Sequence, residues 1–75
     1  MNRITAERIK KLRESREWTK QRLSEELGMQ SYTSITGWEK GENYPRVAEV
    51  IQLSKLFNVS TDYLLGLTDI KKWWQ

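Results

Sequence analysis

Residues 18–45 read WTKQRLSEELGMQSYTSITGWEKGENYP, and two short helices separated by a turn account for this segment best. The hydroxyl of Thr19 can accept a hydrogen bond from a free amide of a first helical turn, so it predicts a helix start. Leu23 and Leu27 then lie on one face, at positions i and i+4. Gly28 predicts the end of this first helix.

The second helix is expected to begin at the cap residue Ser31, run through Lys40 and end at Gly41. Two helices joined by a tight turn that starts with glycine have the layout of a helix-turn-helix motif. Helical spacing places Ile35 and Trp38 on the inner side. The outer side carries mostly small side chains and consists of Thr33, Thr36, Gly37 and Lys40. A helix with such an outer side can enter the roughly 12 Å major groove of DNA, although an ordinary amphipathic helix facing water fits the periodicity equally well.

One further helix is expected upstream of this segment and one downstream of it. Upstream, helical spacing predicts a helix from about Ala6 to Arg16, with Thr5 as its cap and Ile4 packed across the cap. Downstream, Pro45 suits the position just before a helix, and an apolar stripe predicts one that extends to about Phe57. The stripe consists of Val47, Val50, Ile51, Ser54 and Phe57.

Ser60 predicts a last short helix, TDYLL, that Gly66 ends. No segment alternates between apolar and polar residues for more than a few positions, so we expect no β-sheet. The predicted fold is therefore all-α, a compact arrangement of five helices. We expect residues 1–66 to form the domain and residues 67–75 to form a C-terminal tail.

Length and composition limit what this chain can do. It has 75 residues, which is enough for one small core and too few for a two-domain enzyme. It contains neither cysteine nor histidine, which excludes disulfides, thiolate nucleophiles, imidazole catalysis and nearly all zinc sites. We expect no enzyme activity, no cofactor and no metal. The start, MNRITAERIKKLRE, is charged at once and no apolar run could span a bilayer, so a soluble cytoplasmic protein is expected.

The positive charge is concentrated in the first half of the chain. Residues 1–41 carry nine basic and six acidic side chains, whereas residues 42–75 carry four of each. The net charge of +3 is compatible with a polyanionic partner and is also ordinary for a soluble protein. Charge alone therefore leaves both interpretations open.

The segment quoted above and the later run LSKLFNVSTDYLLG together resemble the helix-turn-helix family of phage repressors and Cro, also called the XRE family. The resemblance covers residues 6–66. It depends on Leu23, Leu27, Gly28, Ile35, Trp38, Glu39, Gly41, Pro45, Asn58, Val59, Ser60, Tyr63, Leu64, Leu65 and Gly66. It implies a lambda-repressor-like domain that binds operator DNA, usually as a two-fold dimer, with its third helix in the major groove.

The resemblance also implies roles for single residues. Base contacts would come from Tyr32, Thr33 and Gly37, with Ser34 and Thr36 as neighbours. Phosphate contacts would come from Thr19, Lys20, Ser31, Lys40 and Arg46. A structural role falls to Arg13, Ile35, Trp38 and Glu39, where Arg13 and Glu39 form an ion pair that joins the first and third helices. This sequence differs from the family pattern at Lys20, where glutamine is common, and by one additional turn residue, Gln30.

The C-terminal residues allow two interpretations. Apolar side chains there could form a dimer surface or pack back on the same chain; they are Tyr63, Leu64, Leu67, Ile70, Trp73 and Trp74. A DNA-binding transcriptional repressor of a bacterium or phage accounts best for the whole pattern. The alternative is a helical protein-interaction module, antitoxin-like or anti-repressor, that does not bind DNA.

Overall fold

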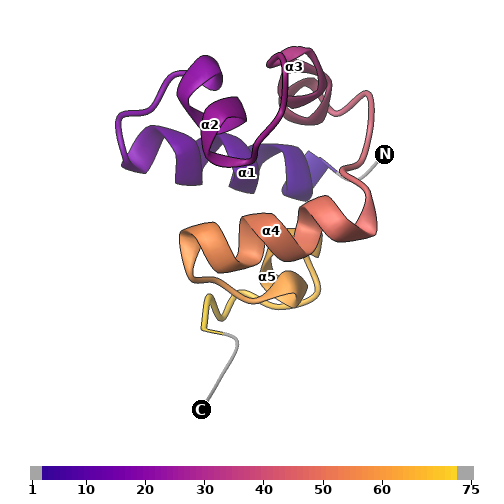
Figure 1. Ribbon diagram of the computed structural model, residues 1–75. Coiled ribbons are helices and arrows are strands. Elements are labelled where there is room, and N and C mark those ends of the chain that lie inside the picture. Colours follow the sequence, from indigo (N-terminus) through magenta and orange to yellow (C-terminus); the bar gives the residue numbers. More distant parts are fainter. Residues whose placement is uncertain (1–2, 73–75) are drawn as a thin grey trace.

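The computed structural model describes residues 3–72, and this range contains five α-helices and no strand (Figure 1). The helices are α1 (Arg3–Ser15), α2 (Lys20–Glu26), α3 (Thr33–Lys40), α4 (Val47–Phe57) and α5 (Thr61–Leu65). The all-α prediction with five helices is confirmed.

Helix α1 lies at the centre of the fold, with α2 and α3 on one side of it and α4 and α5 on the other (Figure 1). Its apolar residues Ile9 and Leu12 contribute to a single core between the two groups of helices. Burying one such side chain stabilises the fold by about 1.5–3 kcal/mol. The core consists of Ile9, Leu12, Leu23, Leu27, Ile35, Trp38, Val50, Leu53, Phe57, Val59 and Leu64.

Local sequence signals set several helix ends. The Thr19 hydroxyl accepts a hydrogen bond from the amide of Arg22 at 3.0 Å, and the Ser60 hydroxyl accepts one from the amide of Tyr63 at 2.9 Å. Gly41 ends α3 in the left-handed conformation, at a φ of 79°, which a side chain would disfavour. These predicted caps and this predicted stop are confirmed.

Three sequence expectations about helix ends and faces are wrong. Thr5 does not cap α1, because the helix already begins at Arg3 and Thr5 is fully buried within it. Ser31 is not the cap residue of α3, since the helix begins at Thr33 and Tyr32 takes the cap position. On α4, Val47 and Ile51 are 77% and 43% exposed instead of buried, because α4 uses a narrower inner face than the stripe suggested.

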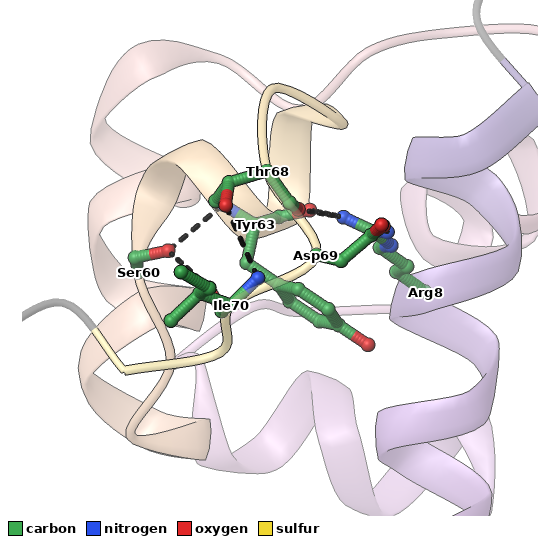
Figure 2. A network of polar contacts seen from close by, with 6 residues as sticks. All are labelled: Arg8, Ser60, Tyr63, Thr68, Asp69 and Ile70. Atoms are coloured by element: carbon green, nitrogen blue, oxygen red, sulfur yellow. Dashed lines mark hydrogen bonds and ion pairs between the residues drawn. The ribbon is translucent and has the colours of Figure 1, made fainter.

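The C-terminal segment, residues 67–72, packs back on α1 and α5 around the guanidinium of Arg8 (Figure 2). Arg8 donates hydrogen bonds to the carbonyls of Tyr63 at 2.5 Å and Thr68 at 2.7 Å, and pairs with Asp69 at 2.7 Å. The same guanidinium lies 4.0 Å from the centre of the Tyr63 ring. The amide of Ser60 donates to the carbonyl of Lys71 at 2.5 Å.

This packing changes the set of residues available for a dimer surface. Leu64 is 1% exposed and belongs to the core, so it offers no surface to a partner. Tyr63 is half-buried beneath Arg8, whereas Leu67 is 74% exposed. Trp73 and Trp74 lie outside the described residues.

Candidate nucleic-acid interface

Helix α3 has a buried apolar side and an exposed side of short polar residues. Ile35 and Trp38 are 0% and 2% exposed, so they anchor the helix in the core. Thr33 and Ser34 are exposed and Thr36 is half-buried. None of these three side chains is long, so the backbone of α3 can come close to a second surface.

Hydroxyl groups at the start of α3 hold one another in place. The Ser31 hydroxyl donates to the Thr33 hydroxyl at 3.2 Å, and the Thr36 hydroxyl donates to the carbonyl of Tyr32 at 3.3 Å. The Tyr32 side chain is 47% exposed beside them. The Thr33 hydroxyl accepts in its pair with Ser31, so its own hydrogen can be donated to an acceptor on a base edge or to a phosphate oxygen.

Three basic residues lie at or beside helix ends in this part of the fold. Lys20 is the first residue of α2, Lys40 is the last residue of α3, and Arg46 precedes α4. The structure brings Ser34 and Arg46 together, because both line one shallow polar pocket between α3 and the start of α4. The amide of Arg46 donates to the carboxylate of Glu49 at 2.8 Å, which fixes the backbone at this end of α4.

The loop after α3 adds two residues that the sequence pattern did not single out. Asn43 and Tyr44 line the same polar pocket as Arg46, and Tyr44 is 48% exposed. The stretch GENYP indicated only a break between helices. No periodic signal marks which side chains of such a loop are exposed.

Gly37 is buried, so the outer side assigned to it by helical spacing is wrong. Its carbonyl accepts the amides of Glu42 at 2.9 Å and Asn43 at 3.4 Å, which folds the loop back over it. A Cβ atom at this position would lie 2.7 Å from the Asn43 side-chain nitrogen. Glycine in mid-helix therefore leaves room for the side chain of Asn43, and Gly37 lies beneath the exposed surface rather than on it.

The expected ion pair between Arg13 and Glu39 is present and holds α3 against α1. Two bonds join the guanidinium to the carboxylate, at 2.8 and 3.0 Å, and Arg13 also donates to the carbonyl of Trp18 at 2.7 Å. The two side chains are only 11% and 5% exposed. The hydrogen bond to Glu39 raises the pKa of Arg13 above its ordinary value, although burial acts in the opposite direction.

Residues 3–72 contain no group of three histidine, cysteine or acidic residues placed to hold a metal ion. None of the described helices is long and apolar enough to cross a membrane.

Known proteins share this pattern. A family model described as helix-turn-helix matches residues 9–64. The chain is 35% identical over 63 residues to the HTH-type transcriptional regulator YobD of Bacillus subtilis, an alignment that covers 84% of this chain and 55% of that protein. It is 37% identical over 60 residues to the HTH-type transcriptional activator BcrR of Enterococcus faecalis, covering 80% and 29% respectively. It is 32% identical over 65 residues to the HTH-type transcriptional regulator ImmR of B. subtilis, covering 87% and 50%. The chain thus spans about half the length of these relatives or less.

Proposed function

Because this chain belongs to the helix-turn-helix family of transcriptional regulators also called the XRE family, we propose that it binds a specific double-stranded DNA sequence through α2 and α3. In this proposal α3 enters the major groove and α2 lies across the backbone. Occupation of an operator then represses transcription, as in regulators of the Cro and cI type. The protein acts in the cytoplasm, without enzyme activity and without a cofactor.

The observation that supports this proposal best is the shape of α3. Its large residues Ile35 and Trp38 are buried, while Thr33 and Ser34 are exposed and short. Bulky side chains on the outer side would keep the helix backbone away from the base edges. The short side chains of α3 allow the backbone to come close to them. Tyr32, Thr33, Ser34 and Thr36 are the proposed base-reading residues; Gly37 is left out because it is buried.

Phosphate contacts supply most of the affinity in this proposal and carry no sequence information. Lys20 supports this role, because a cation in the first turn of a helix is unfavourable beside the positive end of the helix dipole. A phosphate next to Lys20 removes that penalty. The proposed phosphate-contacting residues are Thr19, Lys20, Ser31, Lys40 and Arg46.

The first test is selection of bound duplexes from a random pool, followed by titration of the selected duplex and of an unrelated duplex at several salt concentrations. Lys20→Ala should weaken binding to both duplexes equally and reduce the salt slope by about 1. Thr33→Ala should reduce the preference for the selected duplex by about 1–3 kcal/mol. Equal losses on both duplexes for both variants would contradict this division of roles.

Controls separate binding from folding. Thermal unfolding of both variants should match the wild type to within a few degrees, since both side chains lie at helix starts outside the core. A chain that is folded but binds no duplex at low salt would instead support the protein-interaction module.

Operator binding as a homodimer is part of this proposal, because a two-fold dimer reads two half-sites at once. A reporter gene placed behind the selected operator tests the sign of regulation. Lower expression in the presence of the protein is the expected result, and higher expression would indicate activation, the role that the name of BcrR states for that relative.

A further inference from the structure

Trp38 carries a hydrogen-bond donor that the folded chain does not use. Its side chain is only 2% exposed, yet within residues 3–72 its indole N–H has no acceptor. In the same range, the Thr5 oxygen is the one side-chain polar atom that is both fully buried and without a partner. The indole nitrogen of Trp38 therefore still reaches the surface. Because buried indole N–H groups usually have a hydrogen-bond partner, this unused donor points to a ligand.

Trp38 meets the surface at the polar pocket between α3 and the start of α4. The pocket measures about 370 Å³, and Asn43 lines it from the loop after α3. Asn43 is exposed, and its carboxamide has no hydrogen-bond partner in the described part of the chain. Its side-chain nitrogen lies against α3, since a Cβ atom on Gly37 would be 2.7 Å away from it. Two neutral N–H donors therefore border the same space.

The first turn of α4 adds positive potential to this pocket. Arg46 precedes α4 and lines the pocket with its positive charge. The first amides of a helix have no partner inside it, and the helix dipole attracts an anion to that end. Glu49 is the one carboxylate in the lining, and it accepts the amide of Arg46 at 2.8 Å. Neutral donors and a cation thus outnumber this single negative group, which fits an anion with several oxygen acceptors.

We propose that this polar pocket holds one backbone phosphate of the bound DNA, with the indole N–H of Trp38 and the carboxamide of Asn43 donating to its oxygens beside Arg46. This inference rests on the proposed function and adds two residues to it. Trp38 then has a second role besides anchoring α3 in the core. A DNA phosphate is favoured over a free phosphate ion, because Glu49 repels both and only the duplex is held in place by other contacts.

The first experiment removes the indole N–H and keeps an aromatic ring. Trp38→Phe should weaken binding to the selected and the unrelated duplex alike, by about tenfold, as expected for one hydrogen bond to a charged group. The slope of log K against log salt should remain that of wild type, because a neutral donor releases no counterion. Arg46→Ala should instead reduce this slope by about 0.9. The matched control is Trp18→Phe, because Trp18 packs on Phe57 away from the pocket; it should bind both duplexes as wild type does.

A second variant separates the hydrogen bond from core packing, since Trp38→Phe also removes volume from the core. Asn43 is exposed, so Asn43→Ala should unfold at the temperature of wild type. It should nevertheless weaken binding to both duplexes equally and leave the salt slope unchanged. Full affinity in Asn43→Ala together with full affinity in Trp38→Phe overturns the proposal.

A change on the DNA side tests the contact itself. Single phosphates of the selected duplex are replaced by uncharged methylphosphonates, one position at a time. At one position, the loss of affinity should be at least about threefold smaller in Trp38→Phe than in wild type, because groups in contact show non-additive effects. Losses that simply add at every position would mean that the indole N–H contacts no phosphate, and the proposal would be wrong.

The indole N–H signal of Trp38 in the NMR spectrum gives an answer with wild-type protein alone. The chain has four tryptophans, and this signal is assigned by its connection to the other protons of Trp38. It should shift when the selected duplex is added and stay in place with the same concentration of inorganic phosphate.

The other outcomes of this titration separate the inference from the proposed function. A duplex that binds without moving the Trp38 signal overturns the inference and leaves the proposed function intact. If no duplex binds and inorganic phosphate moves the signal, the proposed function and the DNA phosphate are both refuted, and the pocket is a site for a free anion. A signal that neither the duplex nor inorganic phosphate moves refutes any anion in the pocket.

Discussion

At the scale of single residues, the hydroxyl of Thr5 has the most unusual environment. It is fully buried in α1, and its oxygen has no hydrogen-bond partner in residues 3–72. A buried hydroxyl without a partner costs about 1–3 kcal/mol, whereas an apolar group of the same shape avoids this cost.

We therefore expect Thr5→Val to raise the free energy of unfolding by about 1 kcal/mol, measured from the urea midpoint. Thr19→Val is the control of opposite sign, because the Thr19 hydroxyl caps α2, and its loss should lower stability by about 1 kcal/mol. If Thr5→Val also lowered stability, the Thr5 hydroxyl would have a partner after all.

Glu39→Gln should lower stability by about 3 kcal/mol, because it leaves the buried guanidinium of Arg13 without its counter-charge. Glu26→Gln is the matched control. Its partner Arg22 is 52% exposed, so that change should stay within about 0.5 kcal/mol. Chemical denaturation of the three proteins checks both values, and equal losses in both variants would show that burial of the pair is unimportant.

The pH dependence of the Arg13–Glu39 pair follows from the direction of the Arg13 shift. A group whose pKa is raised in the folded state contributes full stability below its ordinary pKa and loses it only as the pH rises through the raised value. For Arg13 that window is strongly alkaline. Arg13 therefore stays charged between about pH 6 and pH 9. Over this range, its charge should contribute a constant amount to the difference in free energy of unfolding between wild type and Glu39→Gln.

At the scale of secondary-structure elements, several helix ends were predictable from a single residue, although the cap predicted at Ser31 was wrong. The caps Thr19 and Ser60 and the stop at Gly41 work through contacts within one turn, and those contacts are readable in sequence. The start of α1 was not predictable in this way. Thr5 is buried inside the helix instead of capping it, and its burial depends on helices that are distant in sequence.

Gly37 illustrates a second kind of miss. Helical spacing placed it on the outer side of α3, but the loop at Asn43 folds back and covers it. Periodicity describes a helix alone and contains no information about the path of the loop that follows. The exposure of Val47 was missed for a related reason, since an apolar stripe does not show how wide the buried face is.

The C-terminal segment gives a prediction at this scale. Arg8→Ala removes two hydrogen bonds that hold residues 67–72, to Thr68 and Asp69, and a third to Tyr63 of α5, so this segment should detach while the five helices persist. Amide exchange at Ser60, whose amide donates to Lys71, should accelerate at least tenfold. Trypsin should also cleave after Lys71 or Lys72 sooner than in the wild type.

Arg3→Ala is the control on the same helix. Arg3 is 89% exposed and its pair with Glu7 is 3.9 Å long, so its loss should leave the segment in place. Unchanged exchange at Ser60 in Arg8→Ala would mean that other contacts, such as packing on Tyr63, hold the segment.

At the scale of the whole molecule, the position of the charge should matter more than its sum. Lys40→Ala and Lys55→Ala remove the same charge from exposed helical positions, one at the end of α3 and one on α4. Lys40→Ala should reduce the slope of log K against log salt by about 0.9, the value for one phosphate contact.

Lys55→Ala should leave this slope within error of the wild type. Titration of one duplex at four or more salt concentrations measures both slopes. Equal reductions would show that DNA responds to net charge alone, and the assignment of Lys40 to a phosphate would then be wrong.

The family was predictable from sequence because its signature residues are spread over most of the chain, from Leu23 to Gly66. The surroundings of the candidate site were less predictable from sequence. The pocket shared by Ser34, Asn43 and Arg46 forms only after α3 and the start of α4 come together, and those residues have no common spacing in sequence.

The bonds from residues 42 and 43 to the carbonyl of Gly37 join α3 and the loop after it into one piece. Lys40 and Arg46 flank this piece, so the interval between their backbones is set when the chain folds. Little conformational entropy then remains to be lost on contact with a ligand. Association should consequently resemble the docking of two preformed bodies, with a smaller negative change in heat capacity than coupled folding produces.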